Sequence, residues 1–97
     1  MLNHLNITLY GKVQGVFLRR TIEHEAERKG IFGFVRNEPD GTVYIEAEGD
    51  EKTLDEFAAW LKAGAGSADA GGGGDYKISQ VEAEKGQFKA FSGFEIR

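Results

Sequence analysis

The sequence predicts an α+β domain in which two amphipathic helices pack on one face of a mainly antiparallel sheet. Segments with strand-like alternation and segments with helical apolar spacing follow one another in the order strand, helix, strand, strand, helix, strand, strand. Each helical segment has one apolar stripe, so both helices suit a single face of the sheet, as in the split βαβ arrangement. A chain of 97 residues can bury its own core, and we predict that residues 1–97 form a single domain.

The first strand and the first helix lie on either side of the segment 11–20. Apolar residues alternate with polar ones along the strand, at Leu5, Ile7 and Leu9. In the helix, Ile22 and Ala26 lie one turn apart, and Leu18 extends this row toward the segment 11–20. Gly30 can end the helix, because glycine readily adopts the left-handed conformation found after many helices.

Two strands joined by a tight turn follow. Residues 31–37 (IFGFVRN) and 42–48 (TVYIEAE) are rich in the β-branched and aromatic residues typical of strands. Between them, Pro39 presets its own φ angle and Gly41 supplies conformational freedom at the end of the turn. This pattern predicts that the chain reverses at residues 38–41.

The second helix and two further strands complete the pattern. Asp50 can cap this helix, whose apolar residues recur one turn apart at Leu54, Phe57, Ala58 and Leu61. Residues 76–84 and 88–97 are predicted as strands with a turn at residues 85–86, the last being an additional C-terminal strand. The connection 63–75 (AGAGSADAGGGGD) is rich in glycine and alanine and is predicted to be flexible.

Composition excludes several classes of function. The chain has no cysteine, which excludes disulfides, thiolate metal sites and a cysteine nucleophile. Its net charge of −4 argues against nucleic acid or anionic lipid as partners, since both require a basic surface. No segment approaches transmembrane length and the N-terminus lacks a signal-peptide pattern, which predicts a soluble cytoplasmic protein without a membrane partner. A small anionic ligand needs only a few local donors and stays compatible with this composition.

The segment 11–20 (GKVQGVFLRR) has the composition of an anion-binding loop. It leads from a strand into a helix, whose first backbone amides lack intrahelical partners and carry the positive end of the helix dipole. Gly15 allows a tight backbone curl, and an arginine at the helix start adds donors suited to phosphate oxygens. An ordinary glycine turn with surface arginines explains the same residues, and at this level both interpretations stay open.

Two known types of phosphate loop do not fit this segment. A P-loop ends in Gly-Lys-Ser/Thr, whereas this segment ends in Leu18, Arg19 and Arg20. The loop of tyrosine phosphatases has a cysteine six residues before its arginine, and Val13 stands at that position. Any phosphoryl chemistry here would therefore use water as the nucleophile.

Two motifs of the chain resemble those of the acylphosphatase family and occur in the same order. The first is G-x-V-Q-G-V-x-[FY]-R, which residues 11–19 match except at Leu18, where the family has Phe or Tyr. The second is G-[FYW]-[AVC]-[KRQAM]-N-x-x-x-G-x-V-x-[IVT]-x-x-x-G, which residues 33–49 match. The ending GFEIR also resembles the last strand of the family. This resemblance implies a ferredoxin-like βαββαβ fold, hydrolysis of acyl phosphates, no cofactor, and a monomer that is inhibited by its product, phosphate.

The resemblance also assigns roles to individual residues. It implies that Arg19 binds the phosphoryl oxygens and that Asn37 orients the attacking water. The implied phosphate-binding loop consists of Gln14, Gly15, Val16, Phe17, Leu18 and Arg19. Lys12, Arg20 and Arg36 are basic neighbours that we interpret as surface charges.

Two alternatives remain at the level of the sequence. An RNA-recognition domain has a similar element order, and residues 29–35 (KGIFGFV) partly match one of its motifs. Ile31 breaks the motif's spacing, however, the run lies on the second strand rather than the third, and the net charge is negative. A catalytically silent regulatory domain would keep the fold without activity. A metal site is not expected, because His4 and His24 lack acidic partners at ligand spacing.

Overall fold

The computed structural model describes residues 2–97, except for the side chains of residues 16 and 69. The elements along the chain are β1 (Leu2–Lys12), α1 (Val16–Lys29), β2 (Phe32–Asn37), β3 (Val43–Asp50), α2 (Glu51–Lys62), the short 3-10 helix η1 (Ala68–Ala70), β4 (Lys77–Lys85) and β5 (Phe94–Ile96). This order confirms the predicted α+β succession. The strands form one sheet in the order β4-β1-β3-β2-β5, antiparallel except for the β2–β5 pair, which is parallel.

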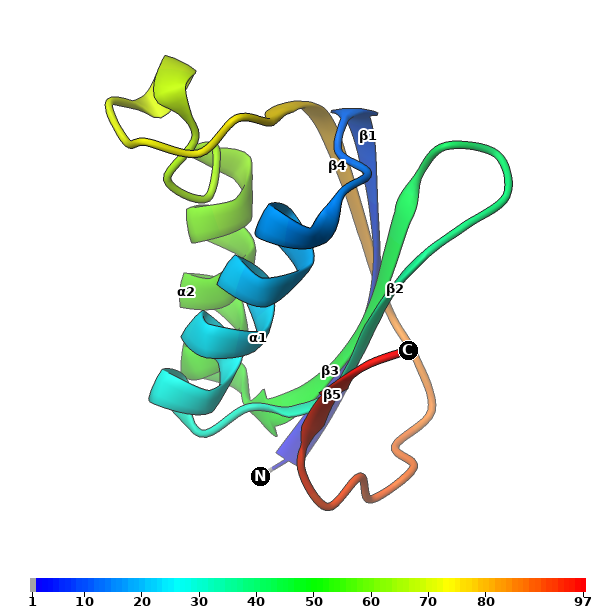
Figure 1. Cartoon of the computed structure of the whole chain (residues 1–97). Coiled ribbons are helices and arrows are strands. Elements are labelled where there is room, and N and C mark those ends of the chain that lie inside the picture. The colour runs from blue at the N-terminus through cyan, green and yellow to red at the C-terminus, as the bar shows by residue number, and fades with distance from the viewer. Residues whose placement is uncertain (1) are drawn as a thin grey trace.

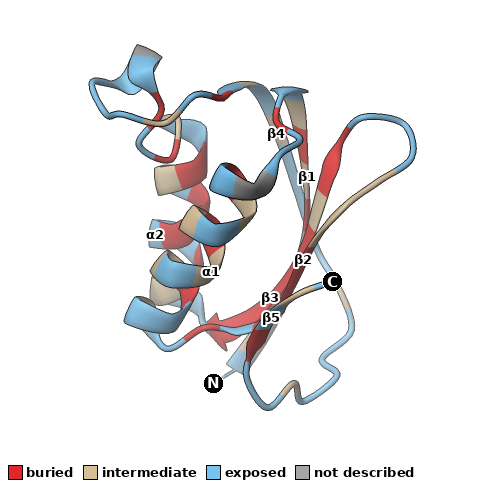
Figure 2. Cartoon of the chain, in the orientation of Figure 1, coloured by how far each residue is buried: buried red, intermediate tan, exposed pale blue. Residues whose placement is uncertain are grey.

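Both helices lie on one side of the sheet (Figure 1). The core fills the space between the two layers, and Figure 2 shows its buried residues on the facing sides of the helices and strands. The predicted apolar stripes supply the helical part of this core, namely Leu18, Ile22, Ala26, Leu54, Phe57 and Leu61. The strands contribute their alternate residues, among them Ile7, Leu9, Val35, Val43 and Ile45.

Local signals set the ends of both helices. Gly30 follows α1 in the left-handed conformation, with φ of 73°, and its N–H donates to carbonyls of the last turn. The Asp50 side chain accepts a hydrogen bond of 2.9 Å from the backbone N–H of Thr53 at the start of α2. α1 begins at Val16, so part of the predicted loop forms the first turn of this helix.

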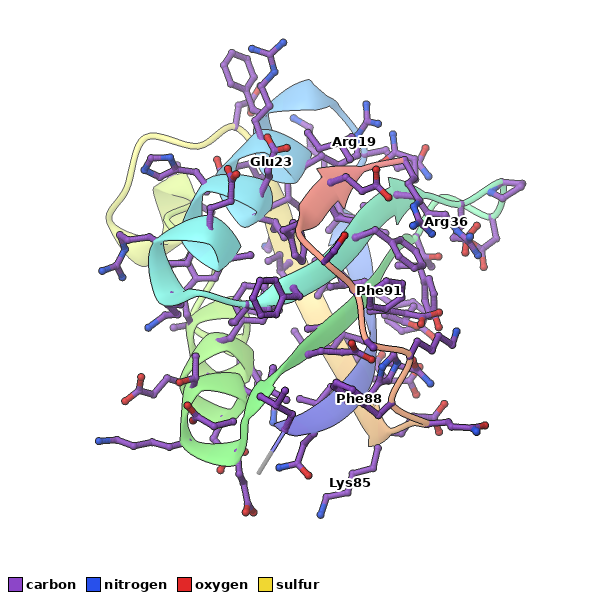
Figure 3. The ribbon with its side chains drawn as sticks, turned by 90° about the horizontal axis from the view of Figure 1, so that it is seen from below. Arg19, Glu23, Arg36, Lys85, Phe88 and Phe91 are labelled. Atoms are coloured by element: carbon purple, nitrogen blue, oxygen red, sulfur yellow. The ribbon has the colours of Figure 1, made fainter. Side chains whose placement is uncertain are left out.

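The C-terminal strand is shorter than predicted. Residues 88–97 were expected to form it, but β5 comprises only Phe94–Ile96. Residues 86–93, which we call the C-terminal strap, instead cross the face of the sheet opposite the helices (Figure 1). Phe88 and Phe91 belong to this strap (Figure 3). The strap amides of Lys89 and Phe91 donate to the carboxylate of Glu48, at 2.6 and 2.8 Å. Because this carboxylate binds the two amides, they do not take part in a strand ladder.

Residues 63–75 carry their own backbone hydrogen bonds. Ser67 pairs with Gly74, and the N–H of Gly72 donates to the carbonyl of Ser67 at 2.8 Å. The side chain of Ala65 is buried, and its carbonyl accepts a hydrogen bond from the hydroxyl of Tyr76. These contacts attach the segment to the start of β4, whereas its flexibility stays a prediction.

A buried polar cluster lies beneath the C-terminal strap. One ring nitrogen of His4 lies 2.6 Å from Glu48 Oε2, and the other lies 3.2 Å from Glu46 Oε1. Glu46 also accepts a hydrogen bond of 2.8 Å from Lys89 Nζ. Sequence spacing gave His4 no acidic partner, because these carboxylates come from β3, which pairs with β1 only in the folded sheet.

Glu48→Gln should destabilise the protein and reduce its sensitivity to acid. Burial alone would raise the pKa of Glu48, but hydrogen bonds from the Lys89 N–H, His4 and the Phe91 N–H hold this pKa below its ordinary value. The carboxylate therefore stabilises the fold above its unfolded pKa, and this contribution is lost as pH falls through the lower folded pKa. A glutamine cannot accept both amides with charge assistance, so we expect a loss of about 2 kcal/mol near neutral pH.

Urea unfolding of wild type and variant at about pH 7 and about pH 3 measures both effects. Glu84→Gln, which changes an exposed carboxylate of β4, is the matched control and should change the free energy of unfolding little. An equal acid-induced loss in Glu48→Gln and wild type would show that Glu48 is not the acid-sensitive group.

Candidate active site

The start of α1 forms an exposed array of backbone donors. Gly15 precedes the helix with φ of 140° and ψ of 166°, a conformation that side chains disfavour. Among the described side chains none caps this end, and the sequence of the first turn contains no acidic residue. The first amides of α1 therefore keep their donors for a ligand, and the helix dipole favours an anion there.

Arg19 lies in the first turn of α1, next to this array (Figure 3). Its side chain is half-buried, and its Nε lies 3.5 Å from the carbonyl oxygen of Gly15. Within residues 2–97, no carboxylate forms an ion pair with Arg19. Its guanidinium thus adds a positive charge to the donor array without a partner that neutralises it.

Asn37 is the last residue of β2 and faces the helix side of the sheet. Alternate residues of a strand share a face, and Val35, two residues earlier, lies in the core under the helices. The side-chain oxygen of Asn37 is buried, and no hydrogen-bond partner for it exists in the described part of the chain. A buried acceptor of this kind costs stability unless it binds a donor, so it is a feature that function can explain.

Gln14 joins the start of α1 to the turn that follows Asn37. Its Nε2 donates to the backbone carbonyls of Glu38, at 2.6 Å, and Thr42, at 3.0 Å. The donor array and Asn37 consequently lie at the same end of the sheet, where the β2–β3 turn and the β1–α1 junction are found (Figure 1). Sequence reasoning missed this contact, since both acceptors are backbone atoms that carry no residue-specific signal.

The remaining residues of the predicted loop occupy different environments. Leu18 is 1% exposed and belongs to the core, so the residue that replaces the family's aromatic side chain has a packing role. Phe17, in contrast, is 75% exposed. Val16 begins α1, and its side chain lies outside the described part of the chain.

Arg36 points away from the donor array, toward the other face of the sheet. Its guanidinium lies over the rings of Phe34 and Tyr44, 5.4 and 5.1 Å from their centroids. It also pairs with Glu38 at 3.1 Å. Arg36, which we interpreted as a surface charge, thus packs on aromatic rings and pairs with a carboxylate away from the donor array.

The described residues offer no metal site. In residues 2–97, no group of three His, Asp or Glu side chains could hold a metal ion. The carboxylates of Glu46 and Glu48 lie at different nitrogens of His4 and do not converge on one point. No helix in the described chain combines the length and apolar character needed to cross a bilayer.

Comparison with known proteins gives consistent similarities over the whole chain. The family model for acylphosphatase matches residues 5–96. An acylphosphatase from Nocardioides sp. is 35% identical over 97 residues, which cover 100% of this chain and 90% of that protein. An acylphosphatase from Archaeoglobus fulgidus is 39% identical over 92 residues, covering 95% of this chain and 94% of that protein. The crystal structure of acylphosphatase from Bacillus subtilis has a TM-score of 0.84 at 30% identity and covers 100% of this chain and 99% of that chain.

Two helices on a five-stranded mixed sheet, with these structural neighbours, define a ferredoxin-like α+β domain. The chain belongs to the acylphosphatase family, which confirms the resemblance of its two motifs. The similarity over the full length supports an acylphosphatase enzyme.

The alternative of an RNA-recognition domain is not favoured. Phe34, one of the two aromatic residues of the motif-like run, is only 3% exposed. The guanidinium of Arg97 lies 4.2 Å from the centroid of its ring, and the ring of Phe91 meets it edge-on at 5.7 Å. A base cannot stack on a ring that is covered in this way.

Proposed function

We propose that this protein hydrolyses acyl phosphates by direct attack of water on a phosphoryl group bound at the start of α1. The side-chain oxygen of Asn37, which is buried and has no hydrogen-bond partner among the described residues, is the observation that carries this proposal. A water molecule that donates to this oxygen would keep a lone pair directed at the phosphorus. Asn37 would thereby orient the nucleophile without removing its proton.

Arg19 and the first amides of α1 would bind the phosphoryl oxygens. The predicted loop residues Gln14, Gly15, Val16, Phe17 and Leu18 supply this part of the backbone. Charge on the equatorial oxygens is the main feature of a phosphoryl-transfer transition state, and fixed donors stabilise it without reorganisation. The same donors would bind inorganic phosphate, so we propose phosphate as both product and inhibitor.

The reaction needs no strong base. The new P–O bond forms from water while the bond to the acyl oxygen breaks, and the carboxylate leaves with the bonding electrons. Both water hydrogens remain on the phosphate product. Because a carboxylate is a good leaving group, positioning and charge stabilisation supply most of the catalysis. A neutral amide at position 37 also avoids the repulsion that a carboxylate would exert on the phosphoryl group.

Hydrolysis of benzoyl phosphate, a small aromatic acyl phosphate, should proceed at the same rate with and without EDTA. We propose that the enzyme needs no metal, because charge stabilisation comes from Arg19 and the backbone amides. The measurement is initial rate after dialysis against EDTA. Loss of activity that a divalent cation restores would contradict metal-independent catalysis, and absence of turnover in both conditions would contradict the proposed activity.

We further propose that the single domain acts as a cytoplasmic monomer without nucleic acid as a partner. The net charge of −4 supports the last point, because binding to nucleic acid generally requires a basic surface.

A further inference from the structure

We propose that the side chain of Gln14 is a positioning residue, which fixes Asn37 relative to the phosphate-binding start of α1. This inference rests on the proposed function, since it assumes that Asn37 orients water. It concerns the side-chain amide of Gln14, whereas the resemblance gives Gln14 only a place in the phosphate-binding loop.

The two acceptors of Gln14 lie next to Asn37 and next to its cross-strand partner. Glu38, whose carbonyl lies 2.6 Å from Gln14 Nε2, follows Asn37 directly in the chain. Thr42, whose carbonyl lies 3.0 Å from the same atom, directly precedes Val43, the residue paired with Asn37 across β2 and β3. The contact therefore joins the residue before Gly15 to both strands, next to the Asn37–Val43 pair on its turn side.

Hydrogen bonds within the β2–β3 turn hold its shape without the help of Gln14. The N–H of Glu38 donates to the carbonyl of Thr42 at 2.9 Å, and the N–H of Gly41 donates to the carbonyl of Glu38 at 3.2 Å. The Asp40 carboxylate accepts from the hydroxyl and the N–H of Thr42, at 2.6 and 3.0 Å, which holds the pKa of Asp40 below its ordinary value. What Gln14 adds is thus the location of the turn relative to α1.

An uncharged side-chain amide suits this task. Its two N–H groups can each serve one carbonyl, whereas a carboxylate would place negative oxygens against both. The side chain of Gln14 is largely exposed, so it buries little apolar surface and contributes little to the core. A purely structural role therefore predicts small effects of its removal on every measurement.

The positioning role predicts a selective effect on turnover. Gln14→Met keeps the length of the side chain but removes both donors, and we expect kcat for benzoyl phosphate to fall about 10- to 100-fold, because small misplacements of a catalytic group are costly. KM and the inhibition constant of inorganic phosphate should change less than about twofold, since the donor array itself is intact. Gln80→Met, on exposed β4, is the matched control and should leave kcat unchanged.

A double-mutant cycle tests the route of the effect. If Gln14 acts through Asn37, Gln14→Met should lower kcat by less than about twofold in an Asn37→Ala background. Gln14→Ala, a second variant without the donors, should give the same pattern, and melting temperatures identify any variant that is unfolded at the assay temperature.

Two results would overturn this inference while leaving the proposed function intact. In the first, Gln14→Met lowers kcat equally in both backgrounds, which would mean that it does not act through Asn37. In the second, phosphate affinity falls together with kcat, which would place Gln14 in the phosphate site. If Asn37→Ala alone leaves kcat unchanged, the proposed role of Asn37 fails, and the inference fails with it.

Discussion

Arg19→Gln should lower kcat for benzoyl phosphate by at least about 10³-fold, since arginines that stabilise phosphoryl-transfer transition states have effects of this size. Glutamine keeps a polar side chain but removes the charge and the forked donor geometry. Inorganic phosphate should also lose most of its ability to raise the melting temperature, because a ligand stabilises the folded state only as far as it binds it. The measurements are kcat, KM and melting temperature with and without phosphate.

The fold itself should tolerate this change. Arg19 forms no ion pair within the described residues, and its positive charge lies near the positive end of the α1 dipole. Its removal should therefore leave the melting temperature without phosphate unchanged or slightly higher. A large decrease would mean that the loss of activity reflects unfolding.

Arg20→Gln is the matched control for this prediction. Successive helical residues point about 100° apart, so Arg19 and Arg20 cannot both reach one small donor array. Arg20 is exposed, and the proposed reaction assigns it no role. We expect kcat of Arg20→Gln to stay near wild type, with a modest rise in KM at low salt from weaker electrostatic attraction. If Arg20→Gln is the inactive variant instead, the motif is misaligned by one residue and the site assignment fails.

Sequence periodicity predicted the parts of the fold that depend on short-range pattern. The stripe from Leu54 to Leu61 predicted the buried face of α2, and Asp50 predicted its start. The first turn of α1 was harder to predict from the sequence, because the apolar residue Phe17 is exposed whereas its neighbour Leu18 enters the core. Apolar character alone does not show which of these two residues is buried.

The C-terminal strap could not be predicted from local pattern. Residues 88–91 have aromatic and alternating character typical of a strand. The carboxylate of Glu48, more than forty positions earlier, binds the strap amides instead. A tertiary contact of this separation overrides local propensity and leaves no periodic signal.

The candidate site also has features that the sequence predicted and features that only the structure reveals. Arg19 and Asn37 were singled out because their residue types and motif positions carry chemical information. The contact of Gln14 with the carbonyls of Glu38 and Thr42 depends on the packing of the β1–α1 junction against the β2–β3 turn, so only the structure reveals it. The burial of the Asn37 oxygen, without a partner in the described part of the chain, is likewise visible only in the structure.

Asn37→Ala should lower kcat by about 10²- to 10³-fold, the usual effect of removing one well-placed polar group from a transition state. The affinity for inorganic phosphate should change less than about twofold, because Asn37 is proposed to bind the water and not the phosphoryl oxygens. Steady-state kinetics of wild type and variant measure kcat, and the inhibition constants of inorganic phosphate measure its affinity. Asn3→Ala is the matched control and should retain wild-type kcat, because Asn3 lies at the end of β1 that is remote from the β1–α1 junction.

Stability should move in the opposite direction from activity in Asn37→Ala. Alanine removes a buried oxygen that has no partner among residues 2–97, and a buried acceptor without a partner destabilises the folded state by about 1–3 kcal/mol. We therefore expect an unchanged or higher melting temperature together with the loss of turnover, as for a polar group kept at a cost for function. A clear decrease in melting temperature with normal kcat would instead assign Asn37 a structural role, and an equal loss of phosphate affinity would move it from water positioning to substrate binding.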